Sequence, residues 1–203
     1  MTTDSDGNNR STFLEGLTQP RDLIYWDGKI YWSDFDEATI ESINIDGTNR
    51  EVIHTDAFRV IDIEVDRQNA RLYWVQNTGG IPSSGIFSSE LDGSGETLVQ
   101  ELFSHGIAID GEENFLYRTD FIRSSIFRVN LDDVTDEEEL VDGSRIRSIS
   151  FDKANDRIYY ADNQGGDVLL SANLSDGFSE TTLVKSLVNR PGSIEIDLSL
   201  IHI

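Results

Sequence analysis

The sequence predicts an all-β fold, a β-propeller built from four-stranded antiparallel blades, on the strength of three observations. A Tyr-Trp-Ser-Asp motif at Tyr31 to Asp34 returns in variant form at Tyr73, Tyr117 and Tyr159, at intervals of 42, 44 and 42 residues. Each copy follows an apolar alternation of period two, which is typical of a β-strand. No helical pattern lies between the copies. Repetition at roughly 40–50 residues is the sequence signature of propellers, in which each repeat forms one blade.

The first strand of each repeat is the apolar alternation, and it ends at an aspartate. Asp66, Asp110 and Asp152 each precede the next signature tyrosine by seven residues, and a further alternation ends at Asp197. The seven-residue spacing leaves room for a turn before the signature strand. The first copy has Asp27-Gly28 in place of that turn, which predicts a two-residue type I′ hairpin because glycine accepts positive φ.

Two more strands complete each repeat. Apolar residues five apart predict third strands over 40–45, 86–91, 126–131 and 169–174. Polar turns follow, and short outer strands are predicted after them, such as 51–53 and 182–184. Each repeat therefore supplies four strands.

The signature residues are expected to hold the blades together. Large rings fill the space between two neighbouring blades, and a small residue after them lets the adjoining blade approach. The final aspartate can accept backbone N–H bonds from the following turn, a role that requires no ligand. The signature residues are Tyr31, Trp32, Ser33, Asp34, Tyr73, Trp74, Tyr117, Thr119, Asp120, Tyr159, Tyr160 and Asp162.

These motifs resemble the low-density lipoprotein receptor class B repeat, also called the YWTD repeat. Pro20 to Leu23, the tetrad, Ile40 and the stretch 45–50 follow that pattern in order. Three residues depart from the pattern: Arg118 and Tyr160 replace tryptophan, and Gln76 replaces aspartate. The resemblance implies a six-bladed propeller, used extracellularly as a ligand-binding module in lipoprotein receptors, basement-membrane nidogens and Wnt co-receptors.

The repeats predict one propeller unit over residues 1–197, with partial blades at both ends. Residues 6–13 align with residues 46–53, so the chain is expected to start inside a blade. We expect the remaining blades of the ring to come from the rest of a longer parent chain. The expected parts are the outer part of a blade at 1–18, blades at about 19–57, 58–102, 103–143 and 144–188, and the start of a further blade at 189–197.

The last six residues, 198–203, interrupt the repeat where a turn and a Tyr-Trp pair are due. Their sequence matches the translation of a common transposon-based sequencing adapter. We interpret them as a non-native tail, and extraneous segments of this kind are set aside in predicting a fold. An incomplete ring is also expected to expose apolar faces on its end blades and to lose stability.

Composition narrows the classes of partner. The chain has 38 acidic and 16 basic residues and a formal charge of -22, which argues against nucleic acid because phosphate binding requires a basic surface. Insertion into a membrane is not expected either, since no apolar stretch has the required length. The negative field favours basic ligand segments or divalent cations, and a merely solvated surface is the alternative. The acidic run at 132–139 lacks the spacing of a calcium loop and is interpreted as a solvated turn.

The sequence shows no catalytic constellation. There are no cysteines and only three histidines, His54, His105 and His202, too few and too scattered for a histidine-based metal cluster. We therefore predict a non-catalytic chain with no cofactor and no metal site. Two alternatives stay open: a six-bladed enzyme of the lactonase or hydrolase type, with a metal at the channel mouth, and a structural spacer in a large surface protein.

A binding face is predicted where the loops after the signature strands meet the loops that lead into each innermost strand. Exposed aromatic side chains among charges are suited to anchoring a peptide. Arg59, Arg145 and Arg190 recur seven residues before an aspartate, where salt bridges to adjacent blades are the alternative to ligand contact. The candidate residues of this face are Phe35, Asp36, Glu37, Arg59, His105, Phe121, Arg123, Arg145, Asn163, Gln164 and Arg190.

The predicted function is thus protein or peptide recognition by a propeller of a secreted or cell-surface protein. The ligand is expected to be a protein or peptide, with basic segments favoured by the charge. In lipoprotein receptors, propeller histidines help acid-dependent ligand release, and any histidine can be protonated near pH 6. The single His105 of this zone does not support predicting such release here.

Overall fold

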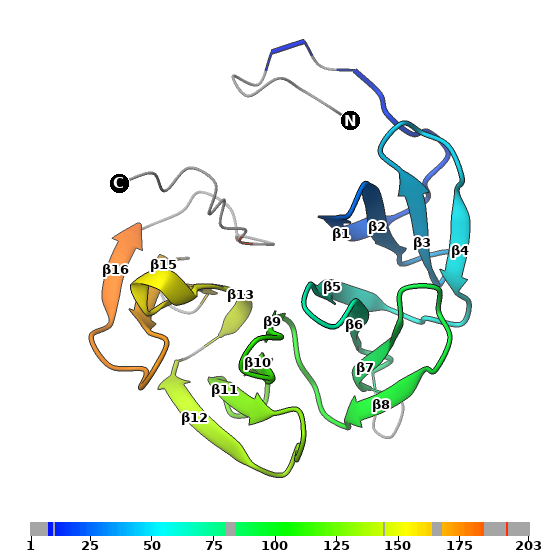
Figure 1. The fold of residues 1–203 in the computed structure, drawn as a ribbon. Coiled ribbons are helices and arrows are strands. Elements are labelled where there is room, and N and C mark those ends of the chain that lie inside the picture. The colour runs from blue at the N-terminus through cyan, green and yellow to red at the C-terminus, as the bar shows by residue number, and fades with distance from the viewer. Residues whose placement is uncertain are drawn as a thin grey trace.

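The computed structural model describes residues 8–9, 11–79, 84–143, 145–163, 168–184 and 194. Four antiparallel sheets of four strands stand side by side in an arc, with the first strand of each sheet nearest the centre and the fourth at the rim (Figure 1). The one helical element within this part of the chain is a short 3-10 turn, η1 (Lys153–Asn155). The predicted all-β propeller of four-stranded blades is confirmed.

Each blade takes its four strands in chain order, from the centre outward. Blade one contains β1 (Pro20–Trp26), β2 (Lys29–Asp34), β3 (Thr39–Asn44) and β4 (Glu51–His54). Blade two contains β5 (Val60–Asp66), β6 (Arg71–Gln76), β7 (Gly85–Glu90) and β8 (Thr97–Gln100). Blade three contains β9 (Ile107–Asp110), β10 (Phe115–Asp120), β11 (Ser125–Asn130) and β12 (Glu137–Asp142). Blade four contains β13 (Ile146–Asp152), β14 (Arg157–Asp162), β15 (Val168–Asn173) and β16 (Thr181–Val184).

The hairpin predicted at Asp27-Gly28 is present. Trp26 pairs with Lys29, and the two residues between them have φ values of 45° and 79°. Positive φ at both central positions defines the type I′ turn, whose twist matches that of the flanking strands.

Two predicted boundaries shift in the structure. Each third strand begins and ends one residue earlier than expected, because pairing with the signature strand extends to its last residue, as in the Asp34–Thr39 pair. The acidic run at 132–139 is also only partly a turn. Its last three residues, Glu137 to Glu139, belong to the outer strand β12, where Glu137 bonds Arg118.

The hydrophobic core consists of three clusters, each lying between two successive blades. One cluster joins Ile24, Tyr31 and Ile40 of blade one to Ile63 and Trp74 of blade two. A second joins blades two and three, and a third joins blades three and four. Burial of these aromatic and branched side chains, about 25 cal/mol per Å² of apolar surface, is the main force that holds successive blades together.

The flank of blade one that faces away from blade two remains open to solvent. Leu23 and Ile63 occupy the same register position, opposite Trp32 and Trp74 respectively, yet they are 67% and 3% exposed. Tyr25, one position further along the flank, is also exposed. Two large apolar side chains are therefore exposed on this flank of blade one.

The described residues include no helix with the length and apolarity needed to cross a membrane. Residues 1–7, 185–193 and 195–203 lie outside the described part of the chain, so the partial blades at the ends and the non-native tail stay predictions.

Candidate functional site

The signature residues serve the framework. All four residues from Tyr31 to Asp34 are buried. Asp34 accepts backbone N–H bonds from Thr18 and Gln19, at 2.9 and 3.0 Å, and a longer one from Glu37 in the following turn. These bonds lower its pKa although burial opposes them. The aspartate therefore ties the loop before the innermost strand to the turn after the signature strand.

The other copies share this arrangement with small changes. Tyr73, Trp74, Tyr117, Thr119 and Tyr160 are buried, whereas Tyr159 is half-buried. Asp120 accepts N–H bonds from Ile122 and Arg123, and Asp162 accepts one from Arg145.

The aspartates that end the innermost strands also have local partners. Asp66 accepts N–H bonds from Gln68 and Asn69, and Asp110 does the same with the two residues of its own turn. Asp152 accepts from Asn155 and caps η1. These bonds explain the recurrence of aspartate without a ligand, while Asp197 lies outside the described residues.

A second set of polar side chains links one blade to the next around the centre. Asp22 accepts a hydrogen bond from Ile63 N at 3.0 Å, and Asp62 accepts one from Ile107 N at 2.7 Å. Ser148 accepts one from Ile194 N at 2.8 Å. Sequence reasoning missed these residues. The signal was available, since each stands immediately before the apolar alternation of its blade.

Asp22 and Asp62 form a pair of interacting carboxyl groups. Burial raises the pKa of both, the charge of Asp22 adds to the rise at Asp62, and the two side chains are in hydrogen-bonding contact. If both carboxyl groups were ionised, their negative charges would repel each other at contact distance. The pair therefore shares one proton over part of the pH range.

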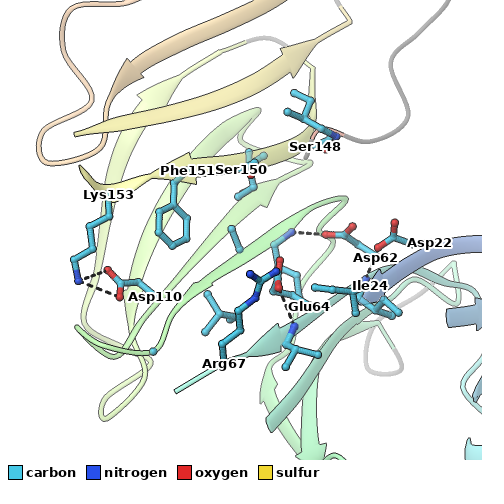
Figure 2. A pocket seen from close by; sticks show the side chains of 18 of the residues that line it. Asp22, Ile24, Asp62, Glu64, Arg67, Asp110, Ser148, Ser150, Phe151 and Lys153 are labelled. Carbon is cyan, nitrogen blue, oxygen red and sulfur yellow. Dashed lines mark hydrogen bonds and ion pairs between the residues drawn. The ribbon is translucent and has the colours of Figure 1, made fainter. Parts of the chain in front are cut away.

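This pair lines a cavity of about 370 Å³ between the innermost strands (Figure 2). Polar groups from all four described blades border it, including Glu64, Arg67 and Ser150. Near its other end Lys153 bonds Asp110 at 3.0 Å. The described residues contain no cluster of three or more potential metal ligands.

The predicted binding face carries two aromatic clusters. In the first, the guanidinium groups of Arg21 and Arg59 lie 4.6 and 5.8 Å from the ring centroid of Phe35. Beside them Gln19 links Arg21 to Asp36, and Glu37 accepts a bond from Thr18.

In the second cluster, His105 packs against Phe121 with ring centroids 4.9 Å apart and the ring planes tilted by 59°. Phe121 is 44% exposed, and its neighbour Ile122 is more exposed still. Burial lowers the pKa of His105 to about 4, with Arg147 adding to the effect. Burial thus favours the neutral form of His105 near pH 6, where an ordinary imidazole begins to be protonated.

Other candidates are placed differently from the expectation. Arg123 is held by Glu137 at 3.2 Å. Arg59 and Arg145 form no ion pair with any described carboxylate, so the salt bridges expected for them are not found. The side chain of Asn163 has buried nitrogen and oxygen atoms without a hydrogen-bond partner. Gln164 and Arg190 lie outside the described residues.

His54 ends β4 and is buried between blades one and two. Its Nδ1 lies 3.1 Å from Glu96, its Nε2 lies 2.8 Å from Ser89 Oγ, and the ring packs on Trp74. Burial lowers its pKa. A serine, a histidine and a carboxylate in this order resemble a hydrolytic triad, but Ser89 has no solvent access, so the group joins blades.

Known proteins match this chain in sequence over only part of its length, whereas solved structures match its fold over most of it. No protein-family model matches the chain. Protein cueball of Drosophila persimilis is 39% identical over 74 residues, which make up 35% of this chain and 11% of that protein. The cueball protein of Drosophila ananassae is 36% identical over the same length. The chain thus spans about a tenth of the curated relatives it matches.

Two solved structures have the same architecture. A chain of a nidogen/laminin complex is 18% identical with a TM-score of 0.67, and the match covers 81% of this chain and 60% of that one. A gluconolactonase of Xanthomonas campestris is 16% identical with a TM-score of 0.70, and the match covers 84% and 64%. The chain is therefore a β-propeller whose fold is similar both to a chain of a nidogen/laminin complex and to a gluconolactonase.

Proposed function

We propose that this chain is a non-catalytic protein- or peptide-binding module of an extracellular or cell-surface protein, and that its ligand meets the face bearing Phe35 and Phe121. The YWTD-type motifs and the fold likeness to a chain of a nidogen/laminin complex support the proposal. The observation that carries it is the exposure of apolar side chains on loops of that face.

Those side chains come from two loops. Phe58 is 51% exposed in the loop before β5, and Phe121 and Ile122 are exposed in the turn after β10. Their neighbours are polar or charged, as in the centres of interfaces where an aromatic anchor is surrounded by a polar rim. The charge of -22 favours basic ligand segments at long range.

A displayed library of random dodecapeptides, selected against the immobilised chain, tests the proposal. We expect binders that lose at least about tenfold in affinity when Phe121→Ala removes the anchor, the size of a moderate hot spot. Phe178→Ala is the matched control, because Phe178 is equally apolar, 72% exposed and located in the turn between β15 and β16, at the opposite face. Its affinity should stay within a factor of two, or about 0.4 kcal/mol.

Failure of the library to give any binder, or binders indifferent to Phe121→Ala, would contradict the binding role and leave the structural spacer as the better interpretation. Circular dichroism of both variants shows whether the blades remain folded.

The second candidate is a hydrolase of the lactonase type, which the carboxyl pair in the cavity favours. A carboxyl group with a raised pKa can serve as a general acid or base near neutral pH. The test is hydrolysis of a panel of sugar lactones, with and without added calcium. Turnover that disappears in Asp62→Asn would establish the enzyme and overturn the non-catalytic proposal.

A further inference from the structure

We propose that the channel mouth on this face binds a carboxylate-bearing segment of the ligand, through a ring of four arginines, Arg21, Arg59, Arg145 and Arg147. This inference rests on the proposed function and names the chemistry of the partner. It departs from the basic ligand that the overall charge favours.

The repeat register places the four arginines on the same face, each at the start of an innermost strand. The carbonyl groups of Arg59 and Arg145 accept bonds from the first residue after their signature strands, Asn77 and Asn163, both at 3.2 Å. Arg21 and Arg147 each directly precede a residue of the cross-blade row, Asp22 or Ser148, at the start of β1 and β13. All four therefore stand where an innermost strand leaves the face.

Arginines outside this ring mostly have acidic partners. Five of them form ion pairs between 2.5 and 3.2 Å: Arg50 with Glu41, Arg71 with Glu90, Arg118 with Glu137, Arg123 with Glu137 and Arg128 with Glu138. Arg157 bonds Asn173, and Arg67 lies against Trp26 at the other end of the channel.

Within the described ranges, no carboxylate forms an ion pair with any member of the ring. In a chain with more than two acidic residues for each basic one, this absence of partners is unexpected for four cations on one face. It is the arrangement expected if the ligand provides the negative charge.

Several acids of the same face are already engaged. Asp36 accepts from Gln19, Glu37 accepts from Thr18, and Asp120 pairs with Arg118. Asp56, in the loop before β5, and Asp142, the last residue of β12, are exposed and are the local competitors for the arginines. A ligand carboxylate has to displace no existing ion pair to reach the ring.

Two of the guanidinium groups are also held in place. Arg21 and Arg59 both lie against the Phe35 ring. A guanidinium that packs on an aromatic ring keeps its edge N–H donors available for a carboxylate, and less conformational entropy is lost when that bond forms.

The charge of -22 does not prevent this contact. Exposed charges more than about 8–10 Å away are screened at physiological salt, whereas a charge-assisted hydrogen bond acts at about 2.8 Å. The net negative charge of the chain therefore affects how fast a ligand approaches. The four arginines determine which ligand group binds at the mouth.

The dodecapeptides selected from the random library test the inference directly. We expect them to be enriched in aspartate and glutamate, and Arg59→Gln and Arg145→Gln each to weaken their binding about tenfold or more, the effect of losing one hydrogen bond to a charged group. Arg71→Gln is the matched control, since Arg71 starts β6 at the opposite face and already pairs with Glu90. It should change affinity less than twofold, or about 0.4 kcal/mol.

The outcomes separate the two proposals. Peptides that lose affinity in Phe121→Ala but are basic, or that bind Arg59→Gln and Arg145→Gln as well as the parent chain, would overturn the arginine ring and leave the binding face intact. Absence of peptides that depend on Phe121 would overturn both. Unchanged circular dichroism of the arginine variants shows that lost binding is not lost folding.

Discussion

Asp62 Oδ2 accepts a hydrogen bond from the backbone N–H of Ile107 across the gap between blades two and three, at 2.7 Å. The same carboxyl group contacts Asp22 of blade one. One side chain thus joins three blades, and it does so in a protonation state that depends on pH.

Asp62→Asn is expected to stabilise the chain at neutral pH. The folded-state pKa of Asp62 is raised, so the folded chain holds a proton that the unfolded chain has already released. Stability therefore decreases as pH rises above the unfolded value and through the folded one. Asparagine keeps the acceptor for Ile107 and removes the repulsion, which should raise the free energy of unfolding by about 1 kcal/mol at pH 7–8. Urea unfolding between pH 5 and 8 measures this.

Asp46→Asn is the matched control for that substitution. Asp46 is exposed, and its pKa is lowered by its bonds to Thr48, so its contribution is present above the unfolded pKa and is lost on neutralisation. The asparagine variant should be slightly less stable at pH 7. A similar response of both variants would show that net charge, not the carboxyl pair, is responsible.

Arg118 replaces the tryptophan of the motif and is 2% exposed. Its guanidinium bonds Gln100 Oε1, Asp120 and Glu137, and it lies over the Phe127 ring. Arg118→Met should destabilise the chain by about 3 kcal/mol, because the carboxylates lose a buried partner. Thermal and chemical unfolding measure the loss.

Arg123→Met is the comparison, since Arg123 binds the same Glu137 from an exposed position. We expect it to cost less than about 1 kcal/mol, as exposed ion pairs do. Equal losses in the two variants would mean that burial of Arg118 contributes nothing.

Gly28→Ala tests the turn chemistry of the first hairpin. Gly28 has φ 79°, and a Cβ there would meet no atom within 4 Å. The expected loss, about 1 kcal/mol, comes from backbone strain alone. Asp27→Asn should be tolerated, because asparagine suits the same type I′ position. A loss well above this size, by urea unfolding, would indicate a contact that the turn geometry does not include.

His105 gives a prediction about acid. Its folded pKa of about 4 lies below the unfolded value of about 6.5, so the folded chain binds fewer protons between these values and loses stability as pH falls. In His105→Asn the drop in Tm between pH 7 and 5 should be smaller. Titration of His105 should not change peptide affinity over this pH range. If the parent chain released peptide at pH 6 and His105→Asn did not, the low pKa would be contradicted.

The repeat was sufficient to predict the blades, because strand pairing inside a blade is local in sequence. The Asp27-Gly28 hairpin and the burial of the tetrad followed from residue chemistry alone. The contacts between blades did not, because Asp22 and Ile63 are 41 residues apart and nothing local pairs them.

The candidate face was predicted less well than the fold. Arg59, Phe121 and His105 lie on loops where predicted, but the absence of acidic partners for Arg59 and the low pKa of His105 depend on side chains from other blades. The sequence analysis did not identify Arg21 and Arg147 as site residues. A repeat of 40 to 50 residues reveals positions that keep the same residue in every blade, and these two positions differ between blades.

Strands β1, β5 and β13 share one irregularity, a register shift between Pro20 and Leu23, Val60 and Asp62, and Ile146 and Ser148. The extra residue falls next to the row of cross-blade acceptors and bends the strand locally without disturbing the pairs that follow. A side chain at that position can therefore be exchanged while the sheet keeps its alignment. The residues that pair the strands are therefore different from the residues that face the rim of the channel. Substitutions at the rim can change what the propeller binds while its strand pairing stays the same.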